Sequence, residues 1–454
     1  MSVLFRKHPL PPGTDALVRS LGRWDLVGLG IGAIIGAGVF VLTGVAAATQ
    51  AGPALVLSFV VAAVACGFAG FAYAELAAAV GGSGSAYGYA YAALGEIVAW
   101  IIGWALMLEY GMAIAAVAVG WAGYFDNALA AVGWSLPAAL RHAPGEGGLL
   151  NLPAFAVIVA LGLLLAHGTR GSARVNGAIV LVKLAAIVVF LAVGIGRVEP
   201  VNWHPFMPFG WSGVLHGAAL IFFAYIGFDA VSTAAAEARD PARDLPFGIL
   251  ASLVLCTLLY VAVAAVLTGM APYHTLNVPS PVAQALLDHG LRWAAALVAA
   301  GAIAGLTSVM LVMFYGQTRV LYAMAGDGLL PPGLARIEPR SRTPRTAIAV
   351  TGTVTALTAA LLPIRAIAEL VNIGTLSAYV AVCAGVIALR IQAPDLPRPY
   401  RAPGGIWCPL AGALACLFLM VQLPAATWWR YFAWMAAGLL VYAAYGYRHA
   451  RRVA

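Results

Sequence analysis

The sequence predicts an all-α protein that crosses a membrane many times, and its composition is the first reason. Of its 454 residues, 63% are hydrophobic and only 9% are charged, and the mean hydropathy is +0.92. Soluble domains carry about 25% charged residues, so this chain has too few charges to cover its own surface in water. We therefore expect a lipid bilayer to be its main solvent.

Apolar segments predict the individual helices. A helix needs about 20 largely apolar residues to cross a bilayer, and twelve such segments follow one another along the chain. They are expected near residues 26–48, 54–79, 93–125, 152–166, 177–196, 214–238, 247–270, 291–325, 346–362, 366–390, 405–424 and 431–447.

The basic residues predict the orientation of these helices. Twelve spans place both termini on one side, and if that side is the cytoplasm, 19 of the 25 Lys and Arg residues lie in cytoplasmic segments. This is the asymmetry of the positive-inside rule. We expect a multi-pass protein of the cell inner (plasma) membrane with cytoplasmic N- and C-termini, and no nucleic-acid partner despite the net charge of +8.

Two other sequence features limit the possibilities. The first 23 residues are polar and basic and precede a full-length apolar run, so we expect no cleaved signal peptide. Five cysteines lie in or beside apolar segments without metal-ligand spacing, so we expect small buried residues and no metal site. They are Cys66, Cys256, Cys383, Cys408 and Cys416.

Glycines predict that the first span is broken. Irregular backbone at membrane depth occurs only where protein buries it or where it lines a cavity. Gly28 and Gly32 have the spacing of helix packing through small residues, whereas Gly36-Ala37-Gly38 near mid-span favours local unwinding. Amides exposed at the start of the outer half-helix would attract a carboxylate.

The sixth span predicts a second break of opposite polarity. It contains Gly227 and Asp229 at about half depth, and unwinding from Ala224 to Gly227 would present free carbonyl oxygens that suit an ammonium group. Breaks in spans one and six are the arrangement expected of two inverted five-helix repeats. A zwitterion would then fit between the two breaks. The expected parts are a cytoplasmic segment 1–25, repeats 26–196 and 214–390, a helix pair 405–447 and a cytoplasmic tail 448–454.

Lys183 is the most informative charge at membrane depth. Ionisable residues inside spans are costly and are functional candidates, and the chain has 23 arginines but only two lysines. A desolvated lysine, unlike arginine, can lose its proton, which would permit a proton-coupled switch. The alternative is a permanently charged lysine in a static ion pair.

Four acids also lie within or beside spans. Glu109 and Asp229 could face a cavity and hold a cationic side chain or a proton, or could balance Lys183 or cap a broken helix. Glu75, at the inner end of the second span, indicates bundle packing or a cytoplasmic gate. Glu96 opens the third span and is expected to be a solvated helix end.

Several motifs resemble one known family. The matching segments are Gly30–Phe40, Gly84–Tyr91 leading to Leu108–Tyr110, Phe222–Glu237, Arg239–Pro246, Gly316–Arg319, Asp327–Pro331 and Val371–Thr375. In this order they resemble bacterial members of the cationic amino acid transporter family, within the amino acid, polyamine and organocation superfamily. The resemblance runs essentially from end to end.

The resemblance implies a fold and a binding site. It implies the five-plus-five inverted-repeat, LeuT-like fold with two further helices, and sodium-independent uptake of L-amino acids. The implied residues are Gly36, Ala37 and Gly38 for the substrate carboxylate, Phe223, Ala224 and Ile226 for its ammonium, Glu109 and Asp229 for the side chain or gating, Met313 for the side-chain pocket, and Lys183 for proton coupling. From their positions in the sequence, Phe223 could cover a small pocket and Glu75 could belong to a cytoplasmic gate.

Two departures from the family pattern affect the expected substrate. Ala105 and Ala236 stand where an acid is frequent in the family, and both changes weaken a preference for arginine or lysine. We expect proton-coupled uptake of small neutral or cationic L-amino acids, with an amino acid or amine exchanger as the alternative. No enzyme motif is present, and we expect no cofactor other than the coupling proton. The sequence does not decide whether a small membrane companion subunit binds.

Overall fold

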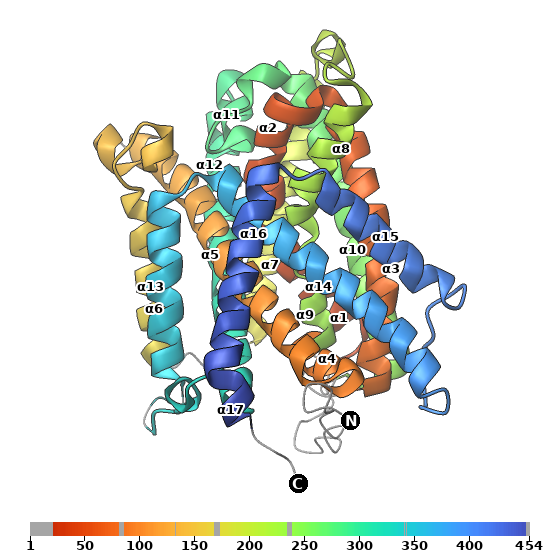
Figure 1. Ribbon diagram of the computed structural model, residues 1–454. Helices are drawn as coiled ribbons and strands as arrows, with labels where there is room; N and C mark the ends of the chain where they lie inside the picture. Colours follow the sequence, from red (N-terminus) through yellow and green to blue (C-terminus); the bar gives the residue numbers. More distant parts are fainter. Residues whose placement is uncertain are drawn as a thin grey trace.

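The computed structural model describes residues 21–80, 86–131, 133–167, 173–233, 238–339, 341 and 343–450. The predicted all-α class is confirmed, since the described residues form helices and their connections, with a single isolated β-bridge between Leu21 and Ala238. Figure 1 shows these helices as one upright bundle, with the described chain beginning and ending near its lower face.

The first half of the chain supplies the red to yellow helices of Figure 1. Their bounds are α1 (Arg23–Ile34), η2 (Gly38–Leu42), α2 (Thr43–Ala46), η3 (Ala47–Ala51), α3 (Leu55–Val80), α4 (Ala86–Leu94), α5 (Glu96–Ala131), α6 (Leu152–His167) and α7 (Ala173–Gly194). Gly95 separates α4 from α5 with φ +97°, a conformation that favours glycine.

The second half supplies the green to blue helices. Their bounds are α8 (Gly210–Ile221), η9 (Phe222–Tyr225), α9 (Asp229–Thr233), α10 (Pro241–Met270), α11 (Pro281–Asp288), α12 (Arg292–Gly326), α13 (Arg345–Leu361), α14 (Ile364–Gln392), α15 (Trp407–Val421), α16 (Ala425–Val441), η13 (Tyr442–Gly446) and α17 (Tyr447–His449). The short helix α11 had no counterpart among the expected spans.

Six helices in the described residues are long and apolar enough to cross a membrane. They are Gly38–Ala79, Glu96–Ala130, Ile179–Arg197, Pro241–Met270, Arg292–Gly326 and Ile364–Gln392. Trp407–Val421 and Ala425–His449 form a further apolar pair bent by 114°, and Leu152–His167, Gly210–Tyr225 and Arg345–Leu361 are shorter apolar helices. Length and apolar character together make this a multi-pass membrane protein.

Helices from the two halves of the chain pack against one another in pairs. The strongest contacts include α3 with α10, α5 with α12, and α6 with α13. Contacts between helices at different positions of the two halves are also matched, and we call these crossed contacts. Helix α10 packs on α1 as α3 packs on α8. Likewise, α12 packs on α7 as α14 packs on α5. These two crossed contacts therefore each have a counterpart in which the two halves have exchanged roles.

One expectation about a helix end is wrong. Glu96 begins α5 but is buried, and its Oε1 accepts a hydrogen bond of 2.7 Å from the Tyr442 hydroxyl of η13. The C-terminal helices cover this position, which the sequence of the third span alone could not reveal. All five cysteines are buried and free, as expected.

Gly227 gives a test of the backbone geometry. Its φ is +118°, and an added Cβ would lie 2.7 Å from the Ala33 carbonyl oxygen. Gly227→Ala should therefore cost about 1–3 kcal/mol of strain and lower the temperature at which the detergent-solubilised protein aggregates. Gly67→Ala is the matched control, because Gly67 lies in α3 with nothing within 4 Å of the added Cβ. Equal behaviour of the two variants would contradict the strained geometry.

Candidate functional site

The first helix is interrupted at the expected glycines. Helix α1 ends at Ile34, Ile35 has an extended backbone with ψ 105°, and helical structure resumes as η2 at Gly38. Gly36 and Ala37 thus lie in the gap, and both are buried. The N–H groups at the start of η2 have no preceding helical turn to bond to.

The sixth predicted span is interrupted as well. Helix α8 ends at Ile221, the tighter turn η9 covers Phe222–Tyr225, and Ile226 adopts an extended conformation with ψ 135°. After Gly227 the chain becomes helical again at Asp229. The carbonyl groups at the end of α8 therefore lose their helical partners.

The two interruptions are in direct contact. A Cβ on Gly38 would lie 2.3 Å from the Cα of Ala224, so only glycine permits this approach. On the other side, Gly227 packs on the backbone of Ala33. Segments almost two hundred residues apart in sequence thus form one continuous surface of irregular backbone inside the bundle.

Side chains from neighbouring helices bond to the carbonyls that the breaks release. The Tyr260 hydroxyl of α10 lies 3.0 Å from the Ile34 oxygen and 2.9 Å from the Ala224 oxygen, so it bridges both breaks. Asn372 Nδ2 of α14 donates to the carbonyls of Ala219 and Leu220 at 2.7 and 2.8 Å. Sequence reasoning missed both roles, although Asn372 belongs to a motif that it had singled out.

Lys183 bonds to the end of α1. Its Nζ donates to the Gly32 carbonyl, and to the Ile35 carbonyl at 2.9 Å, and the side chain is fully buried. Within the described part of the chain no carboxylate lies within 4.0 Å of it. The structure therefore does not contain the static ion pair that was the alternative interpretation of Lys183.

An apolar wall faces the first interruption. Val309 of α12 lies 3.5 Å from the position of a Cβ on Gly36. Met313 follows one helical turn later and is also buried. Met313 was expected near a side-chain pocket; Val309 was not singled out, and only its approach to Gly36 reveals it.

Glu109 and Asp229 lie with a tyrosine rather than with Lys183. The Tyr110 hydroxyl donates to Asp229 Oδ2 at 3.1 Å. Glu109 is 1% exposed, and neither of its carboxylate oxygens has a hydrogen-bond partner in the part of the chain described. Glu109 is therefore a buried acid that is available for a proton or a polar ligand.

Aromatic rings cover the lower side of the second break. Phe228 and Tyr379 have ring centroids 5.1 Å apart, and each also packs on Tyr73, at 5.6 and 5.2 Å. Phe223 lies within η9 itself and is buried. These rings are buried and pack beside the interruption on the side where Asp229 begins α9.

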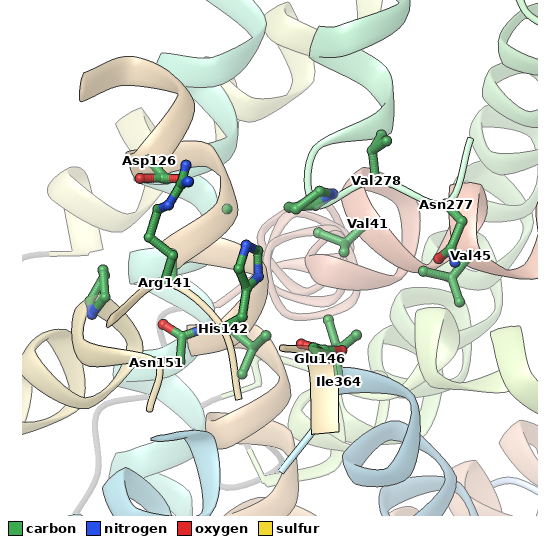
Figure 2. Close-up of a pocket in the computed structure, with 15 residues that line it drawn as sticks. Val41, Val45, Asp126, Arg141, His142, Glu146, Asn151, Asn277, Val278 and Ile364 are labelled. Carbon is green, nitrogen blue, oxygen red and sulfur yellow. The ribbon is translucent and has the colours of Figure 1, made fainter. Parts of the chain in front are cut away.

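A cavity of about 290 Å³ lies above the first interruption. Figure 2 shows Val41 and Val45 on one side of it and His142 and Glu146 on another, with the paired Asp126 and Arg141 at its edge. It lies beside the C-terminal half of the broken helix, where Val41 belongs to η2 and Val45 to α2.

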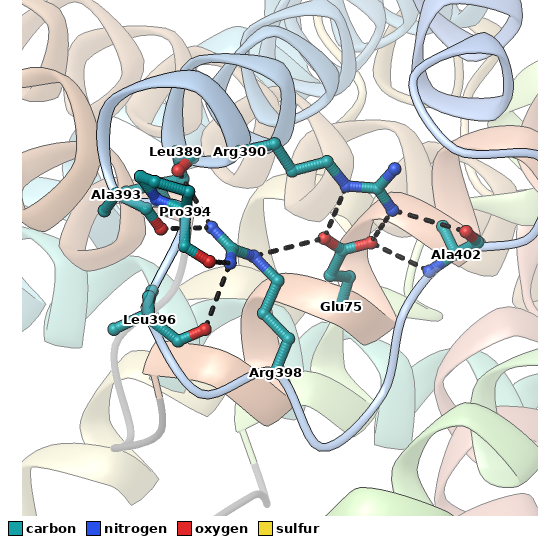
Figure 3. Close-up of polar contacts among 8 residues, drawn as sticks. All are labelled: Glu75, Leu389, Arg390, Ala393, Pro394, Leu396, Arg398 and Ala402. Atoms are coloured by element: carbon teal, nitrogen blue, oxygen red, sulfur yellow. Dashed lines mark hydrogen bonds and ion pairs between the residues drawn. The ribbon is translucent and has the colours of Figure 1, made fainter.

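Glu75 belongs to a separate cluster at the lower face. Its carboxylate accepts bonds of 2.9 and 2.5 Å from Arg390 and 2.8 Å from the Ala402 amide, and Arg398 Nε lies 3.8 Å away. Arg398 also donates to four backbone carbonyls around the end of α14 (Figure 3). The cluster fastens α3 to the segment that joins α14 and α15.

Comparison with known proteins identifies the family. A model described as amino acid permease matches residues 21–445. The chain belongs to the amino acid permease family. Its relatives are transporters and not enzymes.

Individual relatives match over nearly the whole permease. It is 50% identical over 444 residues to the branched-chain amino acid permease BcaP of Bacillus subtilis (strain 168), covering 97% of this chain and 95% of the relative. The methylthioribose transporter of the same organism is 46% identical and covered to 99% in both chains. Cationic amino acid transporter 4 of Homo sapiens is 37% identical over 415 residues, or 87% of this chain and 64% of the relative.

Ala236 lies outside the described residues, as do the first two residues of the motif Gly84–Tyr91 and the last four of the motif Phe222–Glu237. Ala105, the other departure from the family pattern, is buried on α5.

The Glu75 cluster predicts a large stability effect. Glu75→Gln leaves Arg390 and Arg398 without a counter-charge, and removing one partner of a buried pair costs about 3–5 kcal/mol. The detergent-solubilised variant should aggregate at a clearly lower temperature than the wild type. Glu338→Gln is the control, since its pair with Arg345 is solvent-exposed at 3.9 Å and is worth about 0–1 kcal/mol. A shift no larger than that of the control would show that the cluster is not structural.

Proposed function

We propose that this permease takes up neutral aliphatic L-amino acids together with protons, by alternating access. The observation that carries the proposal is the direct contact of two helix interruptions, Gly36–Gly38 and Ala224–Gly227, inside a chain of the amino acid permease family. Membrane transporters bind substrates at such broken helices.

The fold proposed for this activity has twelve crossings and a five-plus-five inverted repeat. Helices α15 and α16, the three shorter apolar helices and the first interrupted helix would complete the crossings beyond the six that are long enough on their own. One of the three shorter helices, Gly210–Tyr225, is the first part of the second interrupted helix. The exchanged packing of α10 on α1 and of α3 on α8 supports the repeat. The distribution of Lys and Arg supports cytoplasmic termini in the cell inner membrane.

The substrate's zwitterionic end would bind between the breaks. The amides around Gly36, Ala37 and Gly38 lie at the start of η2, and the positive end of a helix favours a carboxylate. The carbonyls of Phe223, Ala224 and Ile226 would accept the ammonium group. The Ala224 oxygen already accepts one bond from Tyr260, and a carbonyl oxygen can accept two.

The substrate side chain is proposed to be aliphatic. Val309 and Met313 form an apolar wall beside Gly36, and a relative 50% identical to this chain is named a branched-chain amino acid permease. The 46% identical methylthioribose transporter makes a sugar thioether the competing candidate.

Lys183 is proposed to couple transport to protons in place of sodium. A lysine can release its proton in a buried site, which arginine cannot do. Its two bonds to Gly32 and Ile35 connect it to the end of α1, so loss of the proton would weaken the hold on the broken helix. Glu109, Asp229, Phe223 and Glu75 are proposed to gate access or to contact the side chain.

The proposal is tested with purified protein in liposomes. An imposed inward proton gradient should drive accumulation of labelled L-leucine without sodium. Excess L-isoleucine or L-valine should compete, whereas L-lysine and methylthioribose should not. Leucine exchange that occurs equally with and without the gradient would establish the alternative, an exchanger without net proton movement.

Lys183→Met tests the coupling residue. Methionine keeps the length of the side chain but cannot carry a charge, so gradient-driven leucine uptake should fall to background while leucine binding persists. Val182→Met is the control, because Val182 precedes Lys183 on α7 and is 47% exposed at the outer surface of the bundle. An unchanged pH dependence in Lys183→Met would remove this residue from the coupling step.

A further inference from the structure

The cavity above the first interruption has the chemistry of a second binding site. Its volume of about 290 Å³ is close to the lower end of the range for small-molecule pockets, about 300–1,000 Å³. It therefore suits one amino acid better than a peptide. Val41, Val45, Val119, Val278 and Ile364 give it an apolar wall.

The polar side of the cavity has unsatisfied groups of both signs. Arg141 and Asp126 pair with each other at 3.2 Å, but Arg141 Nε and Asp126 Oδ1 are buried without a hydrogen-bond partner in the described residues. Such groups are costly unless a ligand or water satisfies them. These two atoms are closed to solvent, so a ligand in the cavity can reach the pair only through its exposed part, which is 32% of the Arg141 side chain and 19% of the Asp126 side chain.

Glu146 gives the cavity its net charge. Because Arg141 and Asp126 neutralise each other, Glu146 leaves one negative charge when His142 is neutral, and no cationic side chain of the described chain lies within 4.0 Å of it. Partial burial raises the pKa of its carboxyl, while His142 and the backbone N–H of Ile364 oppose that rise. The Glu146 side chain is exposed, borders the cavity and has no cationic partner within 4.0 Å among the described residues.

The cavity is distinct from the gap between the two helix breaks. Val45 lies seven residues beyond Gly38, which is about 10 Å along a helix axis. Between them Tyr124 of α5 donates to the Phe40 carbonyl at 2.8 Å. Close approach of α5 at Gly120, whose added Cβ would meet Val41 at 2.9 Å, fixes this arrangement.

We propose that this outer cavity binds an aliphatic L-amino acid as a second site, which receives substrate before the gap between the breaks. Glu146 holds the ammonium group, Arg141 and His142 bind the carboxylate, and the valines contact the side chain. Figure 2 shows these protein side chains around the cavity. The inference rests on the proposed function for its choice of ligand. The occupant would touch the outer half of the broken helix directly through Val41 and Val45.

Thiol labelling tests the site directly. Asn277→Cys places a thiol on an exposed residue of the cavity wall, and the five native cysteines are buried. Saturating L-leucine should slow labelling by a membrane-impermeant maleimide about tenfold. Neither 4-methylpentanoate, which lacks the ammonium, nor isopentylamine, which lacks the carboxylate, should protect at the same concentration.

The substitution Glu146→Gln tests whether the Glu146 carboxylate binds the leucine that protects the thiol. In the Asn277→Cys background it should weaken leucine protection about tenfold, the scale expected for loss of one charge-assisted bond. Glu199→Gln is the matched control, since Glu199 is an exposed acid of the connection between α7 and α8 that does not line the cavity. It should leave protection intact.

The outcomes separate this inference from the proposed function. Protection that survives Glu146→Gln unchanged would overturn the outer site, because leucine would then act from elsewhere. Leucine uptake without any protection of the thiol introduced by Asn277→Cys would also overturn it and leave the proposed function standing. If leucine is neither taken up nor protective, the proposed substrate class fails, and the outer site fails with it.

Discussion

Backbone groups released by two helix interruptions need partners in an interior surrounded by lipid, and this requirement organises the bundle. An unsatisfied amide or carbonyl is costly where no water can reach it. Tyr260 bridges the two breaks, Asn372 bonds to the end of α8, and Lys183 bonds to the end of α1. Three different helices thus hold the irregular backbone in place.

This arrangement connects the fold to transport. Because the partners of the breaks belong to α7, α10 and α14, neither broken helix can move without exchanging hydrogen bonds. A transporter needs such discrete alternatives, since packed interiors switch between arrangements and do not deform continuously. The Glu75 cluster at the lower face and the cavity beside Val41 lie on either side of these breaks, where access from each face would be controlled.

Much of the site could be predicted from sequence because its signals are local. Glycines one residue apart in an apolar run predict the break at Gly36, and a glycine followed by an acid at half depth predicts the break at Gly227. Both breaks occur where these patterns place them. The partners could not be predicted in the same way. Tyr260 and Val309 are ordinary residues of apolar helices, and their roles depend on which helix lies opposite. Glu96 was misjudged for the same reason, because η13 covers it.

The sequence by itself determined the solvent, the helical class, the family motifs and the few ionisable groups at membrane depth. Composition and hydropathy act on each segment separately, so they need no knowledge of neighbours. Only the tertiary structure decided which groups meet. It brings Lys183 to backbone carbonyls instead of an acid, puts Tyr110 beside Asp229, and places the exposed Glu146 at the edge of a cavity beside Val41. Such contacts join residues distant in the chain, and packing alone selects them.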